Sequence, residues 1–149
     1  MSLPQENLLL CFSGVLKSDT LWEGMPQKRI LIVEDNSDLR RMFKTALSLA
    51  GFDVDEAADG LEALRVVEER RPDLVVLDLV LRALDGLSVQ QELAARAATA
   101  NIPIVIVTGS TIDTDNVEVA CVLRKPVMPD ELIRTVRQCL RDGAAAGLV

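Results

Sequence analysis

The chain has 149 residues, a formal net charge of -7 and no histidine. This length fits one domain with a single hydrophobic core, and the negative charge argues against long-range attraction to nucleic acid or to an anionic membrane. Without histidine the chain has no phosphohistidine, no His-dependent triad and no histidine general base. Its chemistry must therefore use carboxylates, hydroxyls or lysine.

Short β-branched runs alternate with amphipathic stretches from residue 29 onward, which predicts a parallel sheet with helices on both faces. In chain order we predict a strand over residues 30–33, a helix over 38–50, a strand over 52–57, a helix over 61–71, a strand over 73–79, a helix over 87–98, strands over 102–107 and 119–123, and a helix over 130–141. The sequence thus predicts a doubly wound α/β domain.

The N-terminal region indicates a cytoplasmic protein. The longest apolar run near the N-terminus, residues 8–12, is short and follows no basic residue, so it predicts neither a spanning helix nor a signal peptide. Cys11, Cys121 and Cys139 form no CxxC pair. We expect three free, mostly buried thiols and no zinc site.

Polar side chains stand at the carboxyl ends of four predicted strands. Glu34 and Asp35 follow the first strand, Asp78 lies at the end of the third, Thr108 ends the fourth and Lys125 follows the last. Each alone is most simply a turn or a solvated surface residue. In doubly wound sheets, however, ligands bind at this edge, so five such residues there predict a functional site.

Three clustered carboxylates would repel one another unless a divalent cation lies among them, and Mg²⁺ is the hard cation that carboxylates and phosphate oxygens hold. Asp78 would then remain ionised and act as a nucleophile, as in the formation of an aspartyl-phosphate. Lys125 and Thr108 would supply a positive charge and a hydroxyl to the oxygens of an incoming phosphoryl group.

Residues 29–141 resemble a response-regulator receiver domain of bacterial two-component signalling. Glu34 and Asp35 match the acidic pair for Mg²⁺ in that family, Asp78 matches its phosphoacceptor, and Thr108 matches its hydroxyl residue. Lys125 with the proline after it matches the family's Lys-Pro, whose peptide bond is usually cis. Val80 falls where the family offers a backbone carbonyl to the metal.

The resemblance implies a flavodoxin-like five-stranded sheet with the order 2-1-3-4-5. It also implies that a sensor histidine kinase or a histidine phosphotransfer protein donates the phosphoryl group, and that the domain promotes its own phosphorylation and dephosphorylation. No direct binding to nucleic acid or membrane is expected, and homodimerisation stays open.

The chain departs from the family pattern at three places. The interval from Thr108 to Lys125 is short, so we expect the fourth helix to be short or absent. Val122 stands where the family usually has Tyr or Phe, so the usual coupling of the hydroxyl residue to an aromatic ring is not expected. Arg82 and Ala83 replace a common Pro-Gly.

Residues 1–28 lie outside the resemblance and are expected to be a tag, a tail or an added packing or dimerisation element, and residues 142–149 a C-terminal tail. A phosphorylation-independent pseudo-receiver that acts as an interaction module is the main alternative. A dinucleotide-binding domain would need a glycine-rich turn after the first strand. An aspartyl phosphatase would usually have a second acid where Val80 stands.

Overall fold

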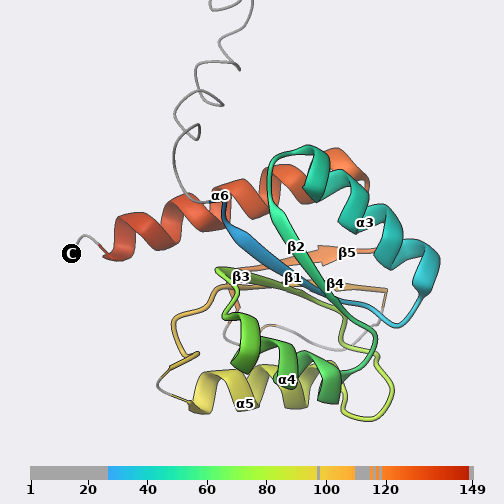
Figure 1. Ribbon diagram of the computed structural model, residues 1–149, viewed down its shortest axis with the longest axis vertical. Coiled ribbons are helices and arrows are strands. Elements are labelled where there is room, and N and C mark those ends of the chain that lie inside the picture. Colours follow the sequence, from blue (N-terminus) through green and yellow to red (C-terminus); the bar gives the residue numbers. More distant parts are fainter. Residues whose placement is uncertain (1–26, 97, 110–114, 116, 118, 148–149) are drawn as a thin grey trace, which may run out of the picture.

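The computed structural model describes residues 27–96, 98–109, 115, 117 and 119–147, and for 144–147 the backbone alone. Its five strands are β1 (Arg29–Val33), β2 (Asp53–Ala57), β3 (Leu74–Leu77), β4 (Ile104–Thr108) and β5 (Cys121–Arg124). They form one sheet with the order β2-β1-β3-β4-β5, and every neighbouring pair is parallel (Figure 1). The predicted fold class and strand order are confirmed.

In the described residues, four helices cover the sheet, two on each face (Figure 1). They are α3 (Ser37–Leu49), α4 (Gly60–Arg70), α5 (Gly86–Ala95) and α6 (Pro129–Gly147). Helices α3 and α6 lie on one face, and α4 and α5 on the other. The first three helices begin after Asn36, Asp59 and Asp85, whose side chains each accept a backbone N–H from the first turn, as N-cap residues do.

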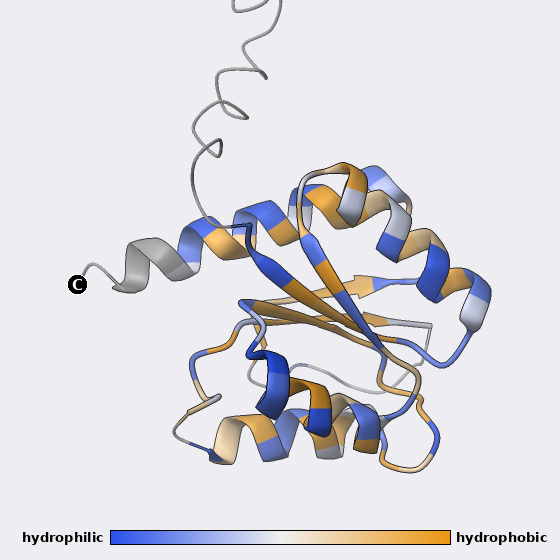
Figure 2. Ribbon diagram, viewed as in Figure 1, coloured by the Kyte–Doolittle hydropathy of each residue, from blue (hydrophilic) through white to orange (hydrophobic). Residues whose placement is uncertain are grey.

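The central strands bury both of their faces. In β1, Ile30 and Ile32 pack in the layer of α3 and α6, whereas Leu31 and Val33 pack in the layer of α4 and α5. This alternation follows from the two-residue period of a strand. Figure 2 shows the hydrophobic side of each helix turned toward the sheet. The two hydrophobic layers fix the sheet, so the carboxyl ends of β1, β3, β4 and β5 form one edge.

Two predicted helix ends were wrong. The last helix continues to Gly147 instead of ending at residue 141. Alanine is the best helix former, and the alanines at 144–146 offset the cost of Gly143. Helix α5 ends at Ala95, three residues early. The Thr99 hydroxyl donates to the Leu93 carbonyl at 2.6 Å, which satisfies a carbonyl of the last helical turn.

The segment between β4 and β5 agrees with the expectation of a short or absent fourth helix, because none of its described residues is helical. Residues 110–114, 116 and 118 lie outside the described part. So do Cys11 and the rest of residues 1–26. Cys121 and Cys139 are free thiols, the first half-buried and the second buried. No helix of the described chain has the length and apolar character needed to cross a bilayer.

Candidate functional site

The acidic cluster forms where β1 and β3 end side by side. Val33 and Leu77 are partners in the parallel register, so Glu34 and Asp78, the next residues, come level with each other. The Asp78 N–H donates to the Val33 carbonyl at 3.0 Å. One carboxylate oxygen each from Glu34, Asp35 and Asp78 lies within 4.8 Å of the others. Glu34 and Asp78 are only 2% and 5% exposed.

Lys125 reaches this cluster from the other side of β4. Its backbone N–H donates to the Thr108 carbonyl at 2.9 Å, which extends the pairing of β5 with β4. Its Nζ atom lies 2.8 Å from Oε2 of Glu34 and 3.0 Å from Oδ2 of Asp78. One ammonium group therefore bonds both buried carboxylates. The peptide bond between Lys125 and Pro126 is cis.

The cluster holds more negative than positive charge. Burial raises the pKa of Glu34; the hydrogen bond from Lys125 opposes this effect and the charge of Asp78 adds to it. Burial by itself would lower the pKa of Lys125, but its bonds to Glu34 and Asp78 outweigh burial and raise that pKa. Lys125 is therefore an ammonium ion at neutral pH, and it is one cation beside three carboxyl groups.

A second cation lies at the rim of the cluster. Nε of Arg82 is 4.0 Å from Oδ2 of Asp35, and the Arg82 side chain is 84% exposed. Such an exposed pair contributes little to stability. The Asp35 side chain is 30% exposed, against 3% for Glu34 and 6% for Asp78, so its carboxylate is the most accessible from solvent in the cluster.

Backbone groups and one arginine orient the acids. Oε1 of Glu34 accepts the Asn36 N–H at 3.2 Å, and the Glu34 carbonyl accepts a bond from Arg40 at 2.8 Å. Oδ1 of Asp78 accepts the Val80 N–H at 3.1 Å. With Oδ2 bound to Lys125, both oxygens of Asp78 have a donor, so the carboxylate is held in one orientation.

Two glycines, which the sequence analysis did not assign to the site, hold the loop after Asp78 in place. A Cβ atom on Gly86 would lie 2.2 Å from the Asp78 carbonyl oxygen, and one on Gly60 would lie 1.9 Å from the Leu84 carbonyl oxygen. Both distances are too short for any side chain. The signal in the sequence is the repeated Asp-Gly pair that begins α4 and α5. Within this loop Ala83 has a left-handed φ of 64°, a conformation that favours glycine.

The predicted site residues divide into two groups. The structure brings Glu34, Asp35, Asp78 and Lys125 into one cluster. Thr108 is fully buried at the end of β4 and joins the cluster through the backbone bond from Lys125. Val80 contacts Asp78 through its N–H, and its predicted carbonyl contact with a metal stays a prediction.

Comparison with protein families identifies the domain. The model of the response regulator receiver domain matches residues 30–137. The chain belongs to this family. The receiver match lies inside the predicted domain of residues 29–141, whose exact limits stay a prediction.

Transcriptional regulators are among its relatives. A probable transcriptional regulator from Porphyridium aerugineum is 38% identical over 122 residues, which cover 78% of this chain and 50% of the relative. The DNA-binding response regulator MtrA of Mycolicibacterium paratuberculosis is 39% identical over 123 residues, or 77% of this chain and 52% of the relative. The chain thus spans about half the length of these curated relatives.

Solved structures of receivers also align. The receiver domain of a Pseudomonas aeruginosa sensor histidine kinase, determined with a magnesium ion coordinated in its active-site cleft, is 29% identical with a TM-score of 0.72; the match covers 78% of this chain and 99% of that one. A CheY-like receiver from Methanospirillum hungatei JF-1 has a TM-score of 0.76 at 24% identity, covering 81% and 99%, and supports the fold alone.

Proposed function

We propose that this receiver domain accepts a phosphoryl group on Asp78 in the presence of Mg²⁺. The observation that supports the proposal is the placement of Lys125 and the Val80 N–H on the two oxygens of Asp78, inside a cluster with two further acids. A buried carboxylate with oriented oxygens and a neighbouring fixed positive charge has the features of a nucleophile in phosphoryl transfer.

The residues present fit a magnesium ion. Mg²⁺ takes oxygen ligands and is usually bound through one or two carboxylates, with waters and phosphate oxygens completing its shell. Glu34, Asp35 and Asp78 offer such oxygens within one coordination sphere's reach, and Lys125 alone does not balance their charge. We assign the metal to these three residues and the Val80 carbonyl. When bound, Mg²⁺ would neutralise charge on the transferring phosphoryl group.

The chain's own residues account for the transfer step. An oxygen of Asp78 attacks the phosphorus of a phosphohistidine on a partner protein, the P–N bond breaks as the P–O bond forms, and the leaving imidazole nitrogen keeps the electron pair and takes up a proton. Lys125 stays an ammonium ion and stabilises the equatorial oxygens. Thr108, at the end of β4, is assigned the role of a hydroxyl donor to the same group.

The partner is a sensor histidine kinase or a histidine phosphotransfer protein, because this chain lacks the histidine that must carry the phosphoryl group. The relatives named as transcriptional or DNA-binding regulators are about twice as long as the matched region. We therefore assign phosphoacceptance, and not DNA binding, to residues 29–141. We propose a cytoplasmic site of action, because the relatives are transcriptional and DNA-binding response regulators.

A phosphorylation-independent interaction module is the second candidate. It is favoured by Val122, a half-buried aliphatic residue on β5 where the resemblance calls for an aromatic ring, and by the non-helical described residues between β4 and β5. Both features bear on how a signal would leave the site. Neither removes a group that the phosphoryl transfer requires.

Intact-mass spectrometry after incubation with acetyl phosphate separates the two candidates. We expect one phosphate-sized adduct that requires Mg²⁺ and is absent in Asp78→Ala. Asp73→Ala is the matched control, because Asp73 is an exposed acid at the opposite end of β3. An unlabelled chain, under conditions that label another receiver, would support the interaction module instead. Asp78→Ala labelled as well as the native chain would move the phosphoacceptor to another residue.

A further inference from the structure

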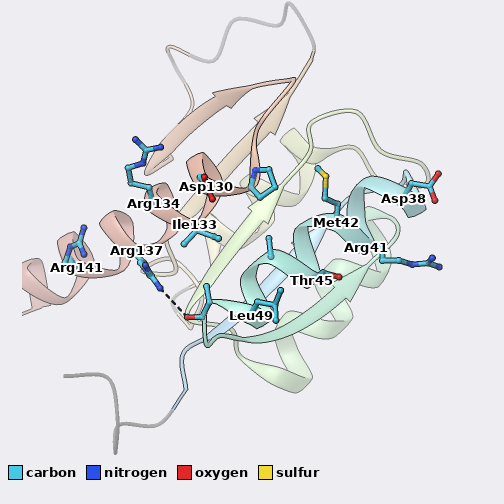
Figure 3. Close-up of a pocket in the computed structure, with 13 residues that line it drawn as sticks. Asp38, Arg41, Met42, Thr45, Leu49, Asp130, Ile133, Arg134, Arg137 and Arg141 are labelled. Carbon is cyan, nitrogen blue, oxygen red and sulfur yellow. Dashed lines mark hydrogen bonds between the residues drawn. The ribbon is translucent and has the colours of Figure 1, made fainter. Parts of the chain in front are cut away.

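Helices α3 and α6 leave an open groove on their side of the sheet. The groove has a volume of about 990 Å³ and is lined only by residues of these helices and their ends. Figure 3 shows Met42 and Leu49 on α3 facing Ile133 on α6 across it. Met42 is 39% exposed and Leu49 is 85% exposed. A helix pair that buried its whole apolar surface would not leave such side chains in solvent.

The groove is basic although the chain as a whole is acidic. Four arginines line it, one from α3 and three from α6, against two aspartates; the arginines are Arg41, Arg134, Arg137 and Arg141. The formal charge of the whole chain is -7. The groove therefore favours an occupant that is apolar with acidic flanks.

Residues 8–22 of this chain have that character. Their apolar side chains are Leu8, Leu9, Leu10, Phe12, Val15, Leu16, Leu21 and Trp22. The charged residues among positions 1–26 are the acids Glu6, Asp19 and Glu23 and a single lysine, Lys17. These residues lie outside the described part of the structure, which begins at residue 27.

The described chain begins beside one end of the groove. The Lys28 carbonyl accepts the Asp53 N–H at 3.0 Å, and Asp53 follows α3 closely. At the same end, Arg137 donates to the Ala50 carbonyl at 3.4 Å, as Figure 3 shows. The six residue-to-residue steps from Trp22 to Lys28 span up to about 20 Å when extended, which is sufficient to bring Trp22 to Leu49. A tether this short gives an effective concentration of about a millimolar or more, so weak contacts suffice.

We propose that residues 8–22 dock in the α3–α6 groove of the same molecule, with Trp22 against Leu49 and the apolar residues before it running along Met42 and Ile133. Burial of these side chains is the driving force, and the groove arginines pair with the acids that flank the segment. The occupant is part of this chain, and neither a metal nor a phosphoryl group takes part.

Tryptophan fluorescence tests the proposal in the full chain. Trp22 is the sole tryptophan and the chain has no tyrosine, so emission reports this one side chain. Leu49→Glu places a charge at the proposed contact. Leu61→Glu is the matched control, because Leu61 is also an exposed leucine, 59% exposed, and lies on α4 at the other face. Both positions are exposed, so both variants are expected to fold, which circular dichroism verifies.

We expect Leu49→Glu to shift Trp22 emission to longer wavelength and to increase its quenching by acrylamide, while Leu61→Glu leaves both unchanged. The difference must persist on dilution, because docking within one molecule is independent of concentration. Equal emission in Leu49→Glu and the native chain would overturn the proposal. A difference that disappears on dilution would overturn it in favour of contact between two copies of the chain.

Discussion

Nζ of Lys125 and Oδ2 of Asp78 are 3.0 Å apart although the residues follow strands that are not neighbours in the sheet. Lys125 follows the edge strand β5, and Asp78 follows β3 at the centre. The lysine side chain thus crosses the end of β4 to fix the carboxylate. It also bonds Glu34, so it is both a positioning residue and the main charge that competes with a metal ion.

Lys125→Ala is expected to separate these two roles. Loss of a fixed donor to the transferring group slows labelling of Asp78 by about 10²–10³-fold. Mg²⁺ binding is expected to tighten, because a competing cation has been removed from the cluster. Labelling rates by mass spectrometry and Mg²⁺ affinity by titration calorimetry measure the two effects. The control is Lys44→Ala. Lys44 lies away from the site, and its Nζ atom is 3.0 Å from Oε2 of Glu56. Equal labelling of the two variants would contradict the role assigned to Lys125.

Magnesium is expected to raise the midpoint of thermal unfolding. A ligand that binds only the folded state at 100 times its dissociation constant stabilises by about 2.7 kcal/mol. Asp35→Asn removes the most accessible carboxylate of the cluster and should abolish most of this gain. Asp38→Asn removes an exposed acid from the first turn of α3, outside the cluster, and should keep it. A gain that is the same in both variants would place the metal elsewhere.

Gly86→Ala and Gly143→Ala are expected to change stability in opposite directions. A methyl group at 86 meets the Asp78 carbonyl oxygen, and overpacking of this kind costs about 1–3 kcal/mol. At 143 nothing lies within 4 Å, so alanine stabilises α6 by up to about 1 kcal/mol. Urea denaturation measures both. Slower labelling of Asp78 is expected in Gly86→Ala alone, since the Asp78 backbone must shift. Native stability and a native labelling rate in Gly86→Ala would show that the loop after Asp78 moves at little energetic cost.

Stability is expected to fall in acid partly through Asp85. The Ser88 N–H donates to Oδ1 of Asp85 at 2.9 Å, and this bond is the main cause of the lowered Asp85 pKa. The bond from the Ser88 hydroxyl lowers that pKa further. A folded-state pKa below the unfolded value of about 3.9 gives stability that is present above that value and is lost as the pH falls through the lowered pKa.

Asp85→Asn keeps an N-cap but removes this titration, so its unfolding free energy should depend less on pH below 4. Asp85→Ala should cost about 1 kcal/mol at neutral pH. Urea denaturation at several pH values measures both. An Asn variant with the native pH dependence would contradict the assignment of the effect to the cap.

The order of elements was predictable because each apolar run in this chain ends at a turn or at a charged residue. The same contrast revealed Glu34, Asp35, Asp78 and Lys125, since parallel strands must end at one edge. The bond from Lys125 to both Glu34 and Asp78 was not predictable in this way. It depends on how far the Lys125 side chain extends across the end of β4, and the sequence pattern gives no distance between side chains.

Contacts made by backbone atoms were also not predictable from the sequence. The bond from the Asn36 N–H to Glu34 depends on the conformation of the turn after β1. Gly60 and Gly86 resembled ordinary turn residues, and their close contacts with the loop depend on how α4 and α5 pack. The predicted end of α6 was wrong, because the helix continues through Gly143 into the alanines that follow it.

The contacts of Gly60 and Gly86 also limit where the molecule can change shape. The loop from Asp78 to Leu84 is wedged against the first turns of α4 and α5, with no room for a methyl group at either contact. The loop therefore has no room to move toward α4 or α5 when Asp78 is modified. We infer that a change at Asp78 is relayed toward Thr108 and Lys125, at the ends of β4 and β5, rather than toward α4 and α5.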